Sequence, residues 1–200
     1  MQGTDTAAEP GMRDRKKART RDSIRTAALD LFEEQGYERT TVDQICRRAD
    51  VAHRTFFRYY PAKEALLFGW DFGQVVLDAF AAAPAELPLW GALDHALTVT
   101  GGRLEEPVEH TNRRRRLRRD LRDVHSVHNY ALVVIDAFTE RTTAIAAERL
   151  GTDPATDLRP AAFGALFSGM VRRHVLSGGV DSRPPADWVQ AFRDVLATTG

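Results

Sequence analysis

The stretch that most constrains the fold of this chain runs from residue 40 to residue 63, with the sequence TTVDQICRRADVAHRTFFRYYPAK. Thr41 and Gln44 have the spacing of a capping box, in which each side chain bonds the backbone of the other residue at a helix start. We therefore expect a helix to begin near Val42. Its apolar residues recur at helical spacing, so one face should pack and the other should meet water: Val42, Ile45, Cys46 and Ala49.

A sharp turn is expected at Asp50, because aspartate tolerates left-handed backbone better than most residues. A second helix should run from about His53 to Tyr60 and end before Pro61. Phe56 and Tyr60 lie one turn apart and should face inward, which leaves His53, Arg54, Thr55 and Arg58 facing out. Such a pair is either a helical hairpin with a solvated basic face or a helix-turn-helix that places its second helix in a DNA major groove.

The segment from Ile24 to Leu67 resembles the DNA-binding domain of the TetR family of repressors. The matching motifs are IRTAALDLFEEQGY, TTVDQI, V-x-x-x-T-F-F-R-Y-Y and PAKEALL, and they cover roughly a quarter of the chain. The resemblance implies an all-α protein with a helix-turn-helix domain at residues 13–68 and a helical domain for ligand binding and dimerisation at residues 69–200. It implies a homodimeric, sequence-specific repressor that binds double-stranded DNA at an inverted repeat and is released by a small molecule.

The outer face of the second helix and the resemblance together predict the DNA contacts. Arg54 and His53, at the start of that helix, are placed to contact bases, since an arginine can reach guanine O6 and N7. Lys63 matches a lysine that the family uses to touch a phosphate. Phe57 replaces a common tyrosine, and Ala52 offers the second helix no side-chain cap. The predicted set is Thr41, His53, Arg54, Thr55, Phe57, Arg58, Tyr59 and Lys63, with Arg19 and Arg21 from the preceding segment.

The preceding segment is strongly basic although the formal net charge of the whole chain is zero. Residues 13–25 contain seven arginines and lysines and two aspartates, a net charge of +5. A run of this kind is most often the solvated start of a helix, but ahead of a DNA-binding domain we interpret it as an arm that reaches phosphates or the minor groove. Residues 1–12 have no hydrophobic period and are expected to be disordered.

The rest of the chain shows helical periods broken by proline and glycine, and no strand pattern. One helix of about 20 residues should run from Lys63 to Ala81 and link the two domains. Further helices are expected at residues 89–104, 106–124, 127–150, 158–176 and 186–197. Small residues in two rows of the helix at 158–176 predict a dimer face together with the last helix: Ala161, Ala165 and Gly169, and beside them Gly164 and Ser168.

Aromatic residues of these helices are numerous enough to line an effector cavity as well as fill a core. The predicted ligand-binding residues are Trp70, Phe80, Trp90, Tyr130, Phe138 and Phe163. The chain after Trp90 is distantly similar to the regulatory domain of MftR-like TetR members, some of which respond to long acyl-CoA. We therefore predict a bulky apolar or acyl-type effector. The arginine-rich stretch from Arg113 to Arg122 is either a solvated helix face or the site for its anionic head.

No catalytic, cofactor or metal motif is present in the sequence. His110, His125 and His128 have poor spacing for zinc, and there is no nucleophile motif or glycine-rich phosphate loop. The single cysteine, Cys46, lies on an inward stripe and is expected to be a buried structural thiol. One cysteine, no long apolar run and no signal core favour a cytoplasmic protein without membrane contact. The alternative to a DNA-binding regulator is a helical protein-interaction or scaffold module; an enzyme is not supported.

Overall fold

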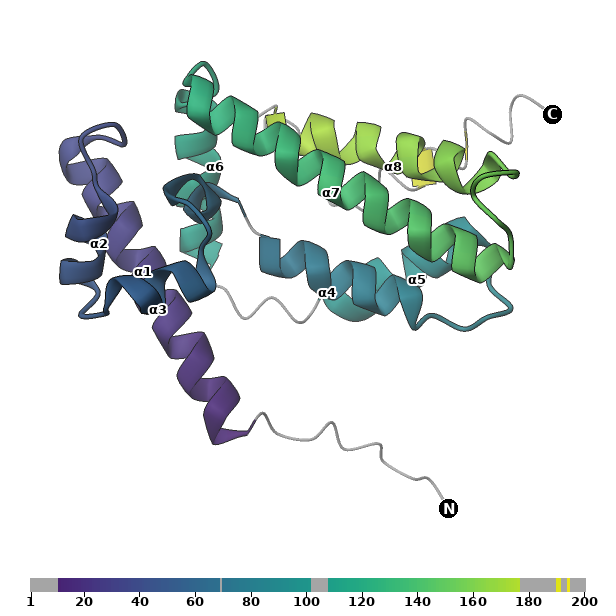
Figure 1. Cartoon of the computed structure of the whole chain (residues 1–200), viewed down its shortest axis with the longest axis horizontal. Coiled ribbons are helices and arrows are strands. Elements are labelled where there is room, and N and C mark those ends of the chain that lie inside the picture. Colours follow the sequence, from purple (N-terminus) through teal and green to yellow (C-terminus); the bar gives the residue numbers. More distant parts are fainter. Residues whose placement is uncertain (1–10, 69, 102–107, 177–189, 192–193, 195–200) are drawn as a thin grey trace. The chain divides into compact units, whose positions relative to one another are not determined.

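The computed structural model describes residues 11–68, 70–101, 108–176, 190–191 and 194 (Figure 1). Within these residues all regular structure is helical, which confirms the predicted all-α class. The chain divides into two compact units, one up to Leu66 and one from Leu67 onward. Among the described helices, none is both long and apolar enough to cross a membrane.

The N-terminal unit packs three helices around one small core. The helices are α1 (Met12–Gln35), α2 (Val42–Arg48) and α3 (His53–Tyr59), followed by the 3₁₀ helix η1 (Lys63–Leu67). One apolar stripe of α1 is buried, as are the inward residues of the α2–α3 pair: Ile24, Ala27, Ala28, Leu31, Phe32, Ile45, Cys46, Ala49, Phe56 and Tyr60. Gly36 ends α1 with a positive φ of 89°, a conformation that side chains disfavour.

The basic segment is not a separate arm ahead of the first helix, as we predicted. It belongs to α1, which begins at Met12 and continues without interruption to Gln35. Arginine, lysine and alanine are good helix formers, and the Thr20 hydroxyl donates to the Lys16 carbonyl at 2.9 Å inside this stretch. The basic side chains from Arg13 to Arg19 are exposed on the helix. The predicted disorder of residues 1–12 lies outside the described residues, except at its last two positions.

Our prediction of a single helix from Lys63 to Ala81 is also wrong. The structure has η1 up to Leu67, and then α4 (Trp70–Ala81). Ala65, Leu66, Leu67 and Phe68 are all buried. Four consecutive residues of an α-helix point around almost its whole circumference, so a regular helix packed on one side could not bury all of them. The change to 3₁₀ geometry and the break after it resolve this conflict.

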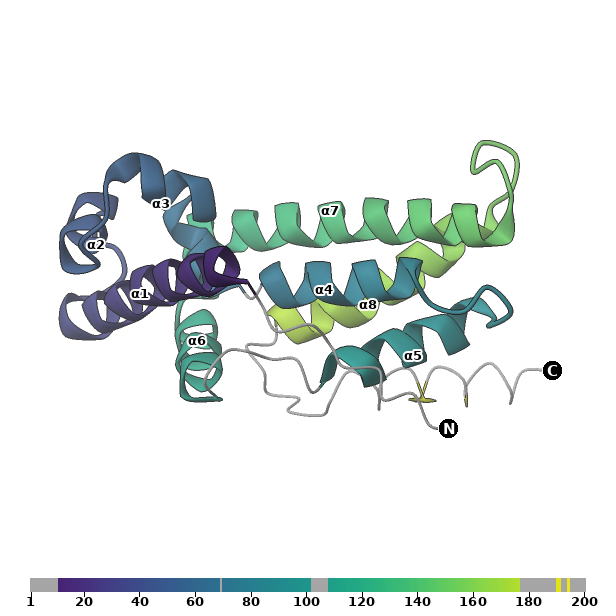
Figure 2. The ribbon, with the colours of Figure 1, turned by 90° about the horizontal axis from the view of Figure 1, so that it is seen from below.

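The C-terminal unit contains α4, α5 (Leu89–Gly101), α6 (Val108–Asp120), α7 (His125–Leu150) and α8 (Arg159–Leu176). Helices α7 and α8 lie alongside each other, and α4 contacts both α5 and α7 (Figures 1 and 2). The start predicted for the helix at 106 and most of the helix predicted at 186–197 lie outside the described residues. The core is formed mainly by apolar side chains of α4, α5, α7 and α8: Leu77, Phe80, Leu93, Ala96, Phe138, Ile145, Phe163 and Phe167.

One of the two small-residue rows of α8 packs within the chain and not against a second copy. A Cβ atom added to Gly164 would lie 2.1 Å from Thr143 Oγ1 and 3.3 Å from the Thr139 carbonyl oxygen, both on α7. Gly164 therefore allows α7 and α8 to approach closely, and our assignment of this residue to a dimer face is wrong. A Cβ atom at Gly169 would meet nothing within 4 Å, and Ala161 and Ala165 are exposed.

An arginine near the end of α7 joins this helix to the loop that follows α4. Arg149 Nη1 donates to the carbonyl oxygens of Phe80 at 3.4 Å and Ala83 at 2.8 Å. Its Nη2 donates to those of Pro84 at 2.6 Å and Leu87 at 3.2 Å. These carbonyls belong to the last turn of α4 and to the loop before α5, where helical partners are missing. One side chain therefore satisfies the end of α4 and fixes the loop.

Candidate DNA-binding surface

The capping box predicted for α2 is present. The Thr41 amide donates to Gln44 Oε1 at 2.8 Å, and the Gln44 amide donates to Thr41 Oγ1 at 3.3 Å. Both contacts satisfy backbone groups at a helix start, and Thr41 is exposed beside them. The structure thus gives Thr41 a capping role, and its predicted contact with DNA would be an additional one.

The turn between α2 and α3 has the predicted geometry. Asp50 is the only residue other than glycine with a positive φ in the described part of the chain, at 52°. The Val51 amide donates to the Cys46 carbonyl at 3.0 Å and closes the turn. Ala52 precedes α3 and offers it no side-chain hydrogen bond, as predicted. The tight turn orients α3 across α2, which is the arrangement of a helix-turn-helix.

Helix α3 has one buried face and one face toward solvent. Phe56 and Tyr60 are buried, and the Tyr60 hydroxyl donates to the Arg21 carbonyl on α1 at 3.2 Å. Four of the predicted contact residues are exposed: His53, Arg54, Phe57 and Arg58. The two others, Thr55 and Tyr59, are half-buried at the edge of this face. The six predicted residues of α3 therefore lie on or beside one outward surface, which we name the α3 face.

Two arginines of the predicted set gather on one ring of the α3 face. The guanidinium of Arg58 lies 5.1 Å from the centroid of the Tyr59 ring, and that of Arg21 on α1 lies 5.7 Å from it. Cations placed over an aromatic face are held by the ring quadrupole. This contact brings α1 and α3 together at the predicted surface. Arg19 is exposed on α1, two residues before Arg21.

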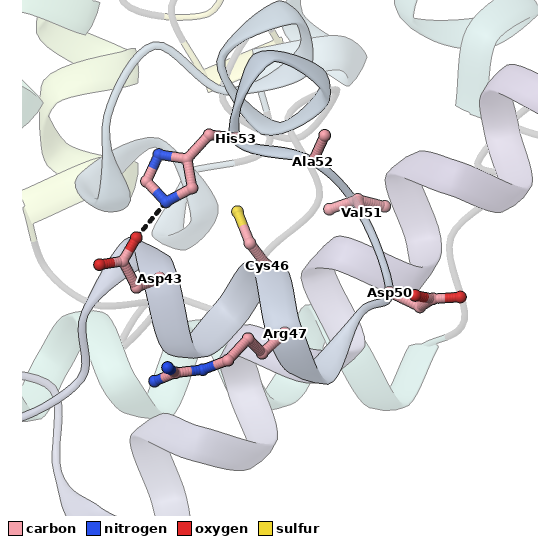
Figure 3. A pocket seen from close by; sticks show the side chains of 7 residues that line it. All are labelled: Asp43, Cys46, Arg47, Asp50, Val51, Ala52 and His53. Atoms are coloured by element: carbon pink, nitrogen blue, oxygen red, sulfur yellow. Dashed lines mark hydrogen bonds and ion pairs between the residues drawn. The ribbon is translucent and has the colours of Figure 1, made fainter.

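His53 has a partner that the sequence did not suggest. Its Nε2 atom bonds Asp43 Oδ1, so the first turn of α3 is tied to the first turn of α2, and both side chains are exposed (Figure 3). The two residues are ten positions apart and belong to no motif, so only the packing of the helices reveals the pair. A carboxylate at this place adds a negative charge to a surface that is otherwise basic, and it fixes the orientation of the imidazole.

Cys46 points into the hollow of about 520 Å³ between α2 and the start of α3 (Figure 3). Its side chain is buried, and burial, followed by the charge of Asp43, raises the pKa of the thiol above its usual value. A thiol held in the protonated form is a poor nucleophile. This agrees with the predicted structural role. Among the described residues, no group of three or more His, Cys, Asp or Glu side chains could hold a metal ion.

The Lys63 side chain is half-buried and forms hydrogen bonds within its own unit, unlike a lysine that is free to bind a phosphate. Its Nζ atom donates to the carbonyl oxygens of Tyr37 at 2.9 Å and Thr40 at 3.0 Å, and it lies 4.0 Å from the centroid of the Tyr37 ring. Burial lowers the pKa of this ammonium group from its usual value. Two of its three protons are used to hold the loop before α2, so one remains for a phosphate.

Replacing Lys63 with methionine should separate these two roles. We expect the free energy of unfolding to fall by about 1.5–3 kcal/mol, because two charge-assisted hydrogen bonds are lost. The slope of DNA affinity against salt should become shallower by roughly one unit if the third proton binds a phosphate, as we propose. Denaturant titration and binding at several salt concentrations measure the two quantities independently. Lys16→Met, at an exposed position on α1, is the control for stability; an unchanged salt slope would leave Lys63 a purely structural role.

The six residues predicted to bind an effector are not brought together. Phe80, Trp90 and Phe163 form one packed aromatic group, with ring centroids 5.7 Å and 4.6 Å apart, and Phe138 belongs to the same core. Tyr130 packs elsewhere, 5.6 Å from Phe68, and the side chain of Trp70 lies outside the described residues. Phe80, Phe138 and Phe163 are buried by their neighbours, so they fill the core instead of lining a cavity.

The arginine-rich stretch is not simply a solvated helix face. Arg113 and Arg114 are buried, whereas Arg116, Arg119 and Arg122 are exposed. Arg118 is half-buried and lines a cavity of about 220 Å³ together with residues of α7 and α8. The interpretation as a solvated face is therefore too simple, because neighbouring arginines of one helix have different surroundings, and the interpretation as an anion site stays a prediction.

Comparison with known proteins gives its strongest result for the N-terminal unit. Residues 24–69 match the profile of bacterial regulatory proteins of the tetR family. The HTH-type transcriptional regulator TcmR of Streptomyces glaucescens is 54% identical over 55 residues, which are 28% of this chain and 24% of TcmR. MftR of Mycobacterium tuberculosis is 41% identical over 58 residues, which are 29% of each chain. The matches thus span only about a quarter of these relatives, so similarity to the MftR regulatory domain remains a prediction.

The whole fold has a counterpart among solved structures. A transcriptional regulator of the TerR/AcrR family from Aquifex aeolicus VF5 superposes with a TM-score of 0.50 and 18% identity, covering 90% of this chain and 99% of the other. At this identity the likeness concerns the fold alone. It shows that an N-terminal helix-turn-helix followed by a helical domain of this kind is an established architecture.

Proposed function

We propose that the protein is a sequence-specific transcriptional repressor that binds double-stranded DNA, because its N-terminal unit has the arrangement of a helix-turn-helix and residues 24–69 match bacterial regulatory proteins of the tetR family. This is a family of transcriptional regulators and not of enzymes. The main support for this proposal is the α3 face, where an arginine at the start of the helix is exposed and free to form hydrogen bonds with DNA bases. Arg54 has no hydrogen-bond or ion-pair partner among the described residues.

The surroundings of the α3 face support DNA binding over protein binding. The exposed basic residues of α1 and the Arg21 and Arg58 side chains around Tyr59 add positive charge to the same unit, in a chain with no net charge. Phosphate contacts of this kind supply affinity, whereas the base contacts of α3 supply specificity. Docking to a protein partner would instead favour an apolar patch, and Phe57 is the one large apolar side chain exposed on α3.

Selection of bound fragments from random double-stranded DNA tests the proposal and separates it from the scaffold alternative. We expect an enriched sequence with two-fold symmetry and half-sites about one helical turn apart or somewhat more. The affinity for this sequence should fall steeply with salt. Fragments retained without any common sequence would contradict specific binding, and a common sequence without symmetry would contradict the dimer.

The second part of the proposal is a dimer formed through α8. Leu158, just before this helix, is exposed. Beside the row that packs on α7, the helix itself exposes small and apolar residues as far as Gly169: Ala161, Ala162, Ala165, Leu166 and Gly169. An apolar helix face in contact with water favours burial against a partner. A second copy would bring the same row to the opposite side of a two-fold axis, as symmetric dimers require. The α3 faces of the two copies would then each bind one half-site of the operator.

Replacing Ala165 with glutamate should break this dimer without unfolding the monomer. The side chain is exposed, so the charge costs little in the monomer but would be buried without a partner in the interface. Sedimentation equilibrium should show a monomer, and operator binding should weaken in parallel. Glu148→Lys on α7 is a control that changes charge at another exposed position. An intact dimer in the Ala165→Glu variant would exclude the α8 row from the interface.

The third part of the proposal is release by a small molecule. Within the part of the helical unit that the structure describes, Phe80, Trp90 and Phe163 pack on one another, so the large apolar cavity that we expected is not seen between these rings. An effector lowers DNA affinity only by its differential affinity for the two states of the protein. Its site must therefore be a cavity whose lining differs between those states.

A further inference from the structure

The cavity of about 220 Å³ in the C-terminal unit lies at one end of the bundle, away from the aromatic core. Its apolar walls come from three elements: Phe68 after η1, Val127 and Ala131 on α7, and Val175 and Leu176 at the end of α8. Phe68, Val127 and Ala131 are buried. The volume equals that of roughly seven waters in the liquid and is below the range of about 300–1,000 Å³ for drug-sized ligands. The cavity therefore suits a small molecule with an apolar body.

Polar and charged residues also line this cavity, and they determine the sign of the charge that a ligand can carry. Arg118 on α6, Arg122 and Asp123 in the turn after it, and His128 on α7 contribute to the lining. Arg122 Nε donates to Asp123 Oδ2 at 3.4 Å, and both side chains are largely exposed. The lining thus carries two guanidinium groups and one carboxylate. An anionic ligand suits a lining with more guanidinium groups than carboxylates.

Arg118 is the group that would meet that charge. It is half-buried, and its guanidinium lies 5.9 Å from the centroid of the Phe68 ring. Nη1 donates to the Leu67 carbonyl at 2.7 Å. Leu67 is the last residue of η1, the segment that begins with Lys63. A guanidinium forms paired hydrogen bonds with a carboxylate, which are stronger than a bond to a neutral carbonyl. A carboxylate in the cavity would thus compete with Leu67 for Arg118.

We infer that this cavity binds a small organic monocarboxylate with an aromatic or short aliphatic body, and that the carboxylate acts by drawing Arg118 away from the Leu67 carbonyl. The inference rests on the proposed function only for its second half, since binding itself requires no DNA. Loss of the Arg118 bond loosens the end of η1, where the chain passes from the DNA-binding unit to the helical unit. The ligand class is narrower than the bulky acyl effector that we expected from the sequence.

Thermal unfolding of the full-length protein with benzoate, phenylacetate and hexanoate tests the binding half. Each acid is compared with its amide, which has the same shape and no charge. At about 100 times the dissociation constant, a binding acid should raise Tm by about 5–10 °C. The amides should leave it unchanged. If no acid raises Tm above the value for its amide, the inference is overturned, and the proposed DNA binding is untouched by that result.

Two variants locate the site and one serves as a matched control. Arg118→Met removes the charge, and Val175→Phe fills the cavity while leaving Arg118 in place; both should abolish the Tm shift. Arg119→Met, at the neighbouring exposed arginine, should retain it. Circular dichroism shows whether each variant is folded, and Val175→Phe keeps the test valid if Arg118→Met is not. A shift that persists in folded Val175→Phe would place the ligand elsewhere and overturn the assignment.

The second half is tested by measuring operator binding with the acid that shifts Tm. The acid should weaken operator binding at least fivefold, and saturating operator should weaken acid binding by the same factor. Arg119→Met should show the same coupling. An acid that binds equally well to free and to operator-bound protein would overturn the competition at Leu67. An absence of operator binding in every condition would instead contradict the proposed function.

Discussion

Replacing Arg54 with alanine is expected to weaken binding to the selected operator by about 1–3 kcal/mol, or roughly 5- to 150-fold. Arg54 is exposed at the start of α3 and has no intramolecular partner among the described residues, so its side chain is available for a guanine edge. The variant should also lose its preference at one base position of each half-site. Binding to a panel of operators with single substitutions, measured at one salt concentration, gives both quantities.

Arg48→Ala is the control for this experiment. Arg48 is an arginine of the same unit, but its guanidinium is held by two hydrogen bonds to Glu34, at 2.9 Å and 2.7 Å. That interaction lowers the pKa of Glu34 and raises that of Arg48. A guanidinium already paired with a carboxylate should contribute little to DNA binding. A uniform loss of affinity across all operators in Arg54→Ala would show that Arg54 contacts a phosphate and not a base.

Replacing Arg149 with alanine should lower the free energy of unfolding by about 2–4 kcal/mol. Four carbonyl oxygens at the end of α4 and in the loop after it lose the Arg149 donor, and those of Phe80 and Ala83, the two buried residues among the four, cannot readily bond water instead. For a chain of this length the loss corresponds to a fall in Tm of about 2–4 °C per kcal/mol. Chemical denaturation followed by circular dichroism measures the change.

Arg141→Ala is the matched control, because Arg141 lies on the same helix and is exposed. It should change the free energy of unfolding by less than about 0.5 kcal/mol. Arg149→Lys should recover only part of the loss, since an ammonium group cannot reach four carbonyls with a planar fork. If Arg149→Ala were as stable as Arg141→Ala, the bonds to the loop would not stabilise the fold.

The DNA-binding unit could be predicted in detail because its signals are local. The capping box of Thr41, the left-handed Asp50 and the inward pair Phe56 and Tyr60 depend on spacings of at most four residues. Each was confirmed, as was the uncapped start of α3 at Ala52. The basic segment was misjudged because its residues suit both an exposed arm and a helix. Only the continuity of α1 decides between them.

The helical unit was predicted in outline but not in its contacts. Hydrophobic periods located its helices, since a period depends on neighbours in the sequence. They could not show that Gly164 packs against Thr143, that Arg149 binds a loop more than 60 residues earlier, or that Phe80 and Phe163 stack in a filled core. These contacts join residues far apart in the chain, and many partners would satisfy the same pattern.

The sequence by itself therefore determined the class of fold, the position of the helix-turn-helix and the outward face of α3, because helix periodicity and capping act within one or two turns. Only the tertiary structure decided which polar side chains have hydrogen-bond partners. His53 bonds Asp43, Lys63 bonds the carbonyls of Tyr37 and Thr40, and Arg118 bonds the carbonyl of Leu67. The physical reason is that a hydrogen bond needs its two atoms within about 3 Å, and sequence spacing does not set that distance for residues on different helices.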